Sequence, residues 1–258
     1  MFQNKWLEKS LCLEVKKRTM NKLKEVIKRE LTGWKRWEVM WLLLATTVIL
    51  GVSVYWKDSP VGIIAALTGI WCVILTGKGK LSSFWFGTVN TVLYAIVAWQ
   101  ARYWGEVMLN LIYYVPMNFV GMYMWSKNMN KDTEEVVKKR LSLKNSIIAY
   151  GLVAVGTIGY GFALKLLHGT LPFVDSMSTV FSVFAQILCV KRCMEQWVLW
   201  IIVDVVTVIM WVYAFANGTG DMATVLMWSI YLINAVIMLI KWIKDTKKVS
   251  IKCEEKYV

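Results

Sequence analysis

Histidine and proline are nearly absent from this chain, and so are the usual arrangements of catalytic residues. One histidine, His168, and three prolines occur in 258 residues. There are no paired carboxylates, no nucleophile beside a base and no phosphate-binding glycine loop, and the turn Gly77-Lys-Gly-Lys80 lacks every other residue of a P-loop. The sequence therefore predicts neither an enzyme nor a protein with a bound cofactor.

Cysteines are too few and too scattered for a disulfide framework. Cys12, Cys253 and the pair Cys189 and Cys193 fall at or near segments that we expect on the reducing side of a membrane. The spacing of Cys189 and Cys193 could place a soft metal on one helix face, but no companion His or Cys ligand accompanies them. We expect no metal site.

Polar stretches are also scarce, and apolar residues dominate instead. Hydrophobic residues make up 57% of the chain, whereas soluble domains have about 45–50%. The 15 tryptophans and 14 methionines fit helices with interfacial aromatic anchors, because strands of a membrane barrel would alternate in polarity. The Lys and Arg residues behind the net charge of +13 lie next to the apolar runs, and this distribution argues against a nucleic-acid partner. The sequence predicts an all-α integral membrane protein surrounded by lipid.

Eight apolar runs have roughly the length of a membrane-crossing helix, about 20 residues. They cover residues 37–56, 60–76, 81–100, 105–125, 145–166, 171–190, 196–216 and 220–242. The basic segments 1–36 and 243–258 flank them. Apolar residues of 1–36 recur at helical spacing, which indicates an amphipathic helix on the membrane surface, and a solvated basic tail is the alternative.

The basic residues divide across these eight runs as a membrane topology requires. All but three of the 30 Lys and Arg residues lie on the same side as the termini, and the exceptions are Lys57, Arg102 and Lys165. Because cytoplasmic loops retain Lys and Arg near helix ends, we expect both termini in the cytoplasm.

Two parts of the chain, residues 60–125 and 171–242, share landmarks at offsets of 112 to 117 residues. Asn118 in the first part corresponds to Asn234 in the second. The other pairs are Pro60 with Pro172, Lys78 and Lys80 with Lys191 and Arg192, Trp85 with Trp200, Glu106 with Asp221, and Trp125 with Trp242.

Each repeat holds three helices, an odd number, so direct chaining would invert the second repeat relative to the first. The run 145–166 restores the orientation. The sequence thus predicts two parallel three-helix bundles joined by a linker helix, a 3+1+3 arrangement, with 37–56 as an extra amino-terminal helix. A transport path would lie between the bundles.

Polar side chains inside the runs lie at a shared depth. They are Asn90, Tyr94, Tyr114, Asn118, Gln186, Asp204, Tyr231 and Asn234. Amides and hydroxyls beside aromatic rings suit a neutral or delocalised-cation ligand that combines a ring with hydroxyl groups. The alternative is that the amides merely bond helices to one another. Pro116 marks either a substrate site or a structural kink.

Asp204 is the one acid well inside a run. It could bind a proton or sodium ion that couples transport to a gradient, or it could be a neutral or capped acid bonded to hydroxyls and indoles. Trp197 and Trp200 lie close to it in sequence and could stack on a ligand or gate its path.

Three stretches resemble the PnuC family of bacterial nicotinamide riboside transporters. They are Phe84-Trp-Phe-Gly-Thr-Val-Asn90, Tyr113-Tyr-Val-Pro-Met-Asn-Phe-Val-Gly121, and Glu195-Gln-Trp-Val-Leu-Trp200 with Asp204. The resemblance implies a SWEET-like fold in the bacterial inner membrane, uptake by facilitated diffusion, and trapping through phosphorylation by a cytoplasmic nicotinamide riboside kinase. Asn118 and Asn234 match the paired asparagines of that family, and Trp197 and Trp200 match its double-tryptophan pattern. Asp204 stands where Asn is expected.

The expected substrate site combines these residues. It comprises Asn90, Tyr94, Tyr114, Asn118, Gln186, Trp197, Trp200, Asp204, Tyr231 and Asn234. A homo-oligomer, for example a trimer, is a further expectation. The alternatives are a membrane-embedded enzyme or receptor that binds a nucleoside, and a transporter of a sugar, thiamin or riboflavin.

Overall fold

A computed structural model describes residues 14, 17–18, 20–21, 24–166 and 172–254. His168, Cys12 and most of the first half of segment 1–36 lie outside these residues. Within the described residues, the regular elements are helices joined by short loops with two isolated β-bridges.

The helices follow the apolar runs closely. They are α2 (Arg36–Trp56), α3 (Pro60–Lys78), α4 (Ser83–Gln100), α5 (Trp104–Met108), the π-helical segment η1 (Leu109–Tyr114), α6 (Val115–Ser126), α7 (Leu143–Leu166), α8 (Pro172–Val190), α9 (Gln196–Ala216) and α10 (Met222–Glu254). The run 105–125 becomes the three consecutive segments α5, η1 and α6. Helix α10 continues past the end of its apolar run because its Lys-rich extension still consists of good helix formers.

Six described helical segments are long and apolar enough to cross a membrane. They are Arg36–Trp56, Pro60–Lys78, Gly105–Ser126, Leu143–Leu166, Gln196–Ala216 and Met222–Lys247. Ser176–Val190 of α8 is a shorter apolar helix, and the Ser, Thr, Asn and Gln side chains of α4 lower its mean hydropathy. The chain is therefore an all-α membrane protein.

Two carboxylates cap the amino-terminal end of α10, at the end of the molecule opposite the Lys-rich termini of α3 and α10. Asp221 accepts a hydrogen bond from the backbone N–H of Thr224 at 2.9 Å, and Asp58 accepts from Met222 and Ala223 at 3.0 and 2.8 Å. Asp58 belongs to the loop between α2 and α3, so the start of α10 is capped from two segments at once. Such caps satisfy amide groups that the first helical turn leaves unpaired.

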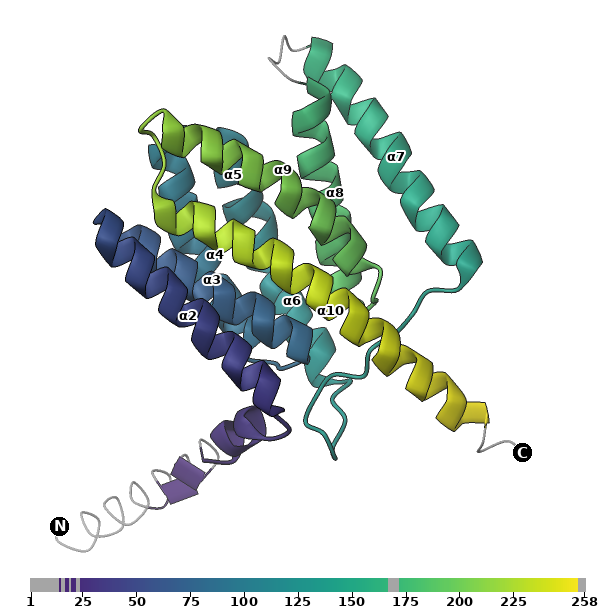
Figure 1. Ribbon diagram of the computed structural model, residues 1–258. Helices are drawn as coiled ribbons and strands as arrows, with labels where there is room; N and C mark the ends of the chain where they lie inside the picture. Colours follow the sequence, from purple (N-terminus) through teal and green to yellow (C-terminus); the bar gives the residue numbers. More distant parts are fainter. Residues whose placement is uncertain (1–13, 15–16, 19, 22–23, 167–171, 255–258) are drawn as a thin grey trace, which may run out of the picture.

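Six helical units form a closed ring. Helix α3 packs against α4, α4 against α6, α6 against α8, α8 against α9, α9 against α10, and α10 returns to α3. Figure 1 shows α3 and α10 side by side, with α9 across from them. Sequence neighbours supply four of these six contacts, and the α6–α8 and α10–α3 contacts join the two halves of the chain.

Two of the helices from α2 to α10, namely α2 and α7, lie outside the ring. Helix α2 packs on both α3 and α10 and so covers their line of contact, whereas α7 packs against α8 and no other described helix (Figure 1). Exposed apolar side chains such as Ile147, Leu152 and Val155 cover α7, as expected for a helix that faces lipid.

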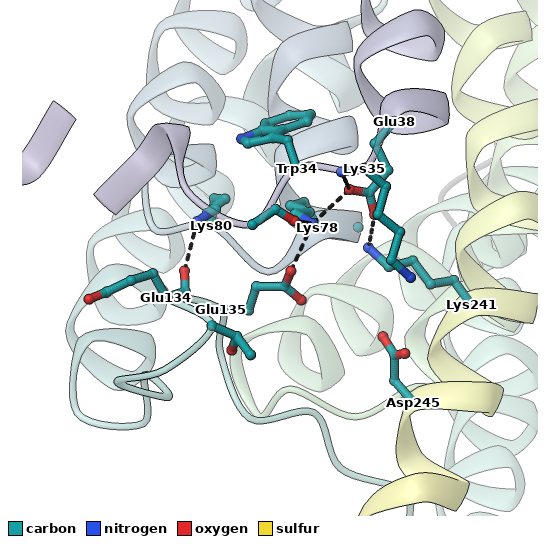
Figure 2. Close-up of polar contacts among 12 residues, drawn as sticks. Trp34, Lys35, Glu38, Lys78, Lys80, Glu134, Glu135, Lys241 and Asp245 are labelled. Carbon is teal, nitrogen blue, oxygen red and sulfur yellow. Dashed lines mark hydrogen bonds and ion pairs between the residues drawn. The ribbon is translucent and has the colours of Figure 1, made fainter. Parts of the chain in front are cut away.

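A cluster of buried charges fastens one end of the molecule, which we call the basic end. Lys78 of α3 pairs with Glu38 of α2 at 2.6 Å and with Glu135 of the α6–α7 loop at 2.8 Å. Glu38 also pairs with Lys241 of α10 at 2.7 Å (Figure 2). Lys78 and Glu38 are each only 2% exposed. Because buried charges are tolerated only when paired, this cluster fixes α2, α3, α10 and the loop relative to one another.

Candidate functional site

The helical ring encloses a cavity of about 930 Å³, part of it open to solvent. All six units of the ring contribute to its wall. The lining residues are Cys72, Val73 and Thr76 of α3; Gly87, Asn90, Thr91 and Tyr94 of α4; Glu106, Asn110, Tyr114 and Asn118 of α5, η1 and α6; Ser182, Gln186 and Cys189 of α8; Trp197, Trp200, Val203, Asp204 and Thr207 of α9; and Met227, Trp228, Tyr231 and Ala235 of α10.

Gly69 of α3 lets two of these residues approach closely. A Cβ at this position would meet the Tyr231 hydroxyl at 1.9 Å and the Asn90 amide nitrogen at 2.6 Å. Asn90 donates from this nitrogen to the carbonyl of Ala65 at 2.8 Å, which fixes its orientation and leaves its amide oxygen as an available acceptor. The absence of a side chain at Gly69 thus places a tyrosine and an amide at the same point of the wall.

The π-helical segment η1 directly precedes Pro116. Proline has no N–H to donate and its ring crowds the preceding turn, and a π-helical turn is one way in which a helix absorbs such an interruption. The widened turn brings Asn110 and Tyr114 to the cavity wall together with Asn118 of α6. The Pro116 position therefore coincides with a change in helix geometry beside the cavity.

Asn118 and Gln186 meet across the contact between α6 and α8. The Gln186 amide donates to the Asn118 oxygen at 3.5 Å, a long hydrogen bond. The Asn118 nitrogen is buried and has no partner among the described residues, and the same holds for the indole nitrogen of Trp197. Buried donors without partners are costly, so both groups have capacity for a ligand.

Aromatic rings surround the acid of α9. Trp200 and Tyr114 lie with ring centroids 6.3 Å apart, and Trp228 and Tyr231 lie 5.1 Å apart. Asp204 is 2% exposed and lines the cavity between these helices. None of the described lining residues is Lys, Arg or His, whereas two, Glu106 and Asp204, are acids. The wall is thus aromatic and amide-rich, with negative and no positive side chains.

Nine of the ten site residues expected from the sequence line this one cavity. They are Asn90, Tyr94, Tyr114, Asn118, Gln186, Trp197, Trp200, Asp204 and Tyr231. The structure places the tenth, Asn234, elsewhere: it is fully buried, accepts from the indole of Trp41 at 3.2 Å and donates to the carbonyl of Val73 at 3.1 Å. Both of its polar groups are thus used to hold α10 against α2 and α3.

Several cavity residues were not expected from the sequence. Glu106 and Asn110 precede Tyr114 on the same helical run, and the four-residue spacing of Glu106, Asn110, Tyr114 and Asn118 on one helix face could have indicated them. Trp228 is another, one turn before Tyr231 on α10. Among the described residues, Cys72, Cys189 and Cys193 are free thiols, and no group of three or more His, Cys, Asp or Glu could hold a metal ion.

Known proteins resemble this chain over most of its length. A family model described as "Nicotinamide mononucleotide transporter" matches residues 59–244. A protein of Neisseria mucosa named "Nicotinamide riboside transporter PnuC" is 41% identical over 86% of this chain and 87% of its own length. A protein of the same name from Haemophilus influenzae is 34% identical over 85% and 95%, respectively.

A solved structure agrees with the sequence comparison. The "Crystal structure of the Vitamin B3 transporter PnuC" superposes with a TM-score of 0.77 at 40% identity and covers 86% of this chain and 97% of the other. The family model, at residues 59–244, spans the chain from the loop before α3 into α10. The chain belongs to the PnuC family of membrane transporters.

Proposed function

We propose that this protein carries nicotinamide riboside across the bacterial inner membrane through the cavity of the helical ring. The relatives from Neisseria mucosa and Haemophilus influenzae bear the name of that substrate. The observation that carries the proposal is the wall chemistry: amides and hydroxyls for a ribose, aromatic rings for a planar base, and acids without any Lys, Arg or His among the described lining residues. Nicotinamide riboside combines hydroxyls with a flat, positively charged ring.

The same wall favours the riboside over the mononucleotide that gives the family model its description. The two molecules differ by one phosphate group. Phosphate sites usually offer Lys, Arg or helix amino termini, whereas the described wall offers the carboxylates of Glu106 and Asp204. A phosphate in this cavity would therefore lose its hydration and meet charges of its own sign.

Named roles follow from position. Asn118 and Gln186 bind ribose hydroxyls at the contact between α6 and α8, and Asn90 offers its amide oxygen from α4. Trp197, Trp200, Tyr114 and Tyr231 enclose the ring of the base, and Tyr94 supports this wall by accepting from the indole of Trp211 at 2.8 Å. Asn234 acts as a link between helices.

We propose that all eight predicted runs cross the membrane in the 3+1+3 arrangement, with α2 as the extra helix and α7 as the linker. The two halves, α3 to α6 and α8 to α10, rock around the cavity. Nicotinamide riboside crosses by facilitated diffusion, and a cytoplasmic kinase traps it by phosphorylation. The basic end and both termini face the cytoplasm, in line with the distribution of Lys and Arg. The homo-oligomer stays a prediction, which mass measurement of the purified protein in detergent addresses.

Uptake into proteoliposomes tests the proposal. We expect labelled nicotinamide riboside to equilibrate across sealed vesicles without a proton or sodium gradient, and the mononucleotide to compete at least about 100-fold more weakly, because it buries an unpaired phosphate. Empty vesicles control for leakage. Uptake that requires an imposed ion gradient would contradict facilitated diffusion, and equal competition by the mononucleotide would contradict the assigned substrate.

A further inference from the structure

We propose that Asp204 is the specificity-determining residue for the positive charge of the ligand ring: its carboxylate acts as the counter-ion of the pyridinium and discriminates against neutral ligands of the same shape. This inference rests on the proposed function, because it assigns a role within that site.

Burial and lack of partners are the first support. Asp204 is 2% exposed and lies one helical turn after Trp200 on α9. In the part of the chain that the structure describes, no side chain or backbone group donates a hydrogen bond to its carboxylate, and no cation pairs with it. Glu38, which is equally buried, has both carboxylate oxygens paired with lysines. Asp204 lacks such a partner within the described chain, so a cation from outside the chain is the group that would stabilise its ionised form.

The surroundings of Asp204 favour an organic cation. Asp204 lines the cavity together with Tyr114 of η1 and Tyr231 of α10. The rings of Tyr114 and Trp200 lie 6.3 Å apart on the same wall. A planar cation in this space would gain attraction from the ring faces and from the carboxylate together.

The rest of the wall does not oppose this assignment. Glu106 adds a second carboxylate to the lining, and no described lining residue carries a positive charge. An arriving cation therefore meets attraction alone, whereas a neutral analogue leaves the buried carboxylate without a partner. The difference in binding free energy between the cationic and the neutral ligand therefore comes from Asp204. The amides contribute equally to both, because they bond to ribose hydroxyls that both ligands carry.

Binding of two probes to the purified full-length protein separates these contributions. The probes are nicotinamide riboside, whose ring is a cation, and its 1,4-dihydro form, whose ring is neutral and nearly the same size. We expect the wild-type protein to bind the cation at least about tenfold more tightly, the difference that one favourable charge contact supplies. Asp204→Asn should lower affinity for the cation by about tenfold or more and change affinity for the neutral probe by less than about threefold.

Two further variants serve as controls, and several outcomes would overturn the proposal. Asn118→Leu should weaken both probes alike, and Asp204→Glu should retain the preference for the cation. Equal binding of both probes by the wild-type protein would overturn the proposal without any variant, so it remains testable if Asp204→Asn does not fold. Equal losses for both probes in Asp204→Asn would also overturn it. A dependence of transport on a sodium or pH gradient that Asp204→Asn abolishes would overturn it as well, because Asp204 would then bind a coupling ion. Failure of the wild-type protein to bind or transport the riboside at all would instead refute the proposed function.

Discussion

Single residues in this cavity differ in what their polar groups already contact. Asn118 and Asn234 occupy equivalent places in the two repeats, and the sequence predicts equivalent roles for them. In the structure, the Asn118 nitrogen has no partner within the described chain, whereas both polar groups of Asn234 are bonded. The cause is Trp41, which belongs to a helix outside the repeat. Repeat analysis can reveal which residues correspond, but it cannot reveal a neighbour that only one repeat possesses.

This difference predicts opposite outcomes for the same substitution. Asn118→Leu should weaken binding of nicotinamide riboside by about 1–3 kcal/mol, because a buried ligand hydroxyl loses its partner. The thermal midpoint of the ligand-free protein should change little, since the Asn118 nitrogen bonds to no described residue and its oxygen accepts only the long 3.5 Å bond from Gln186. Calorimetric titration and thermal unfolding in detergent measure the two effects.

Asn234→Leu should show the reverse. The substitution leaves the Trp41 indole and the Val73 carbonyl unsatisfied in the interior, at a cost of about 1–3 kcal/mol in stability. Affinity for the riboside should stay within about threefold of the wild-type value, because Asn234 does not line the cavity. A large loss of affinity with unchanged thermal stability would place Asn234 in the site after all.

At the scale of elements, sequence periodicity located the helices but not the long-range ties between them. The runs of apolar residues predict the bounds of most described helices to within a few residues, since hydropathy is a local property, whereas α10 continues past its run to Glu254. Lys78 and Lys80 counted toward topology as charges beside the membrane, yet both are buried: Lys78 pairs with Glu38 and Glu135, and Lys80 donates to the carbonyls of Arg29 and Glu134 at 2.8 and 3.0 Å. Their partners lie some 40 to 60 residues away in the chain, beyond the reach of pattern analysis.

The buried cluster at the basic end makes Lys78 important for stability. Lys78→Met should destabilise the protein by about 3 kcal/mol, since it removes one partner from the buried carboxylate of Glu38 and one from the partly exposed carboxylate of Glu135. Lys144→Met is a matched control, because Lys144 is exposed at the start of α7 and the same atoms are lost there. Thermal unfolding of both variants in one detergent gives the comparison. Equal midpoints for the two variants would contradict a stabilising role for the cluster.

The interruption of the helix from α5 to α6 was visible as Pro116, but its consequence was not. Proline indicated either a kink or a substrate site, and the structure contains a π-helical segment immediately before it, with Asn110 and Tyr114 on the cavity wall. The sequence does not show that the turn before Pro116 is π-helical. Glu106 entered the sequence analysis only as the repeat counterpart of Asp221, so it was not expected in the cavity, although its four-residue spacing from Asn110 could have indicated it.

At the scale of the whole molecule, the distribution of basic residues predicts the orientation in the membrane. A green fluorescent protein fused after Val258 should fluoresce, because this domain folds in the cytoplasm. Alkaline phosphatase inserted between α2 and α3, next to Lys57, should be active, because that loop faces the periplasm. An inverted pattern of the two reporters would contradict the orientation and would reverse the direction assigned to uptake.

The two lines along which the halves of the ring meet are unequally reinforced. Between α3 and α10, the Trp242 indole donates to the Gly77 carbonyl at 2.8 Å, Met238 fills the space above Gly77, and α2 spans both helices through Glu38. Between α6 and α8, the Trp125 indole donates to the Cys189 carbonyl at 3.0 Å, and the amide pair of Asn118 and Gln186 adds a long bond of 3.5 Å. No described helix outside the ring packs on both α6 and α8, as α2 does on α3 and α10. The two halves are therefore expected to separate at the contact between α6 and α8, with the contact of α3, α10 and α2 as the hinge. Because Asn118 and Gln186 lie at the α6–α8 contact, opening there would also release the ligand that they bind.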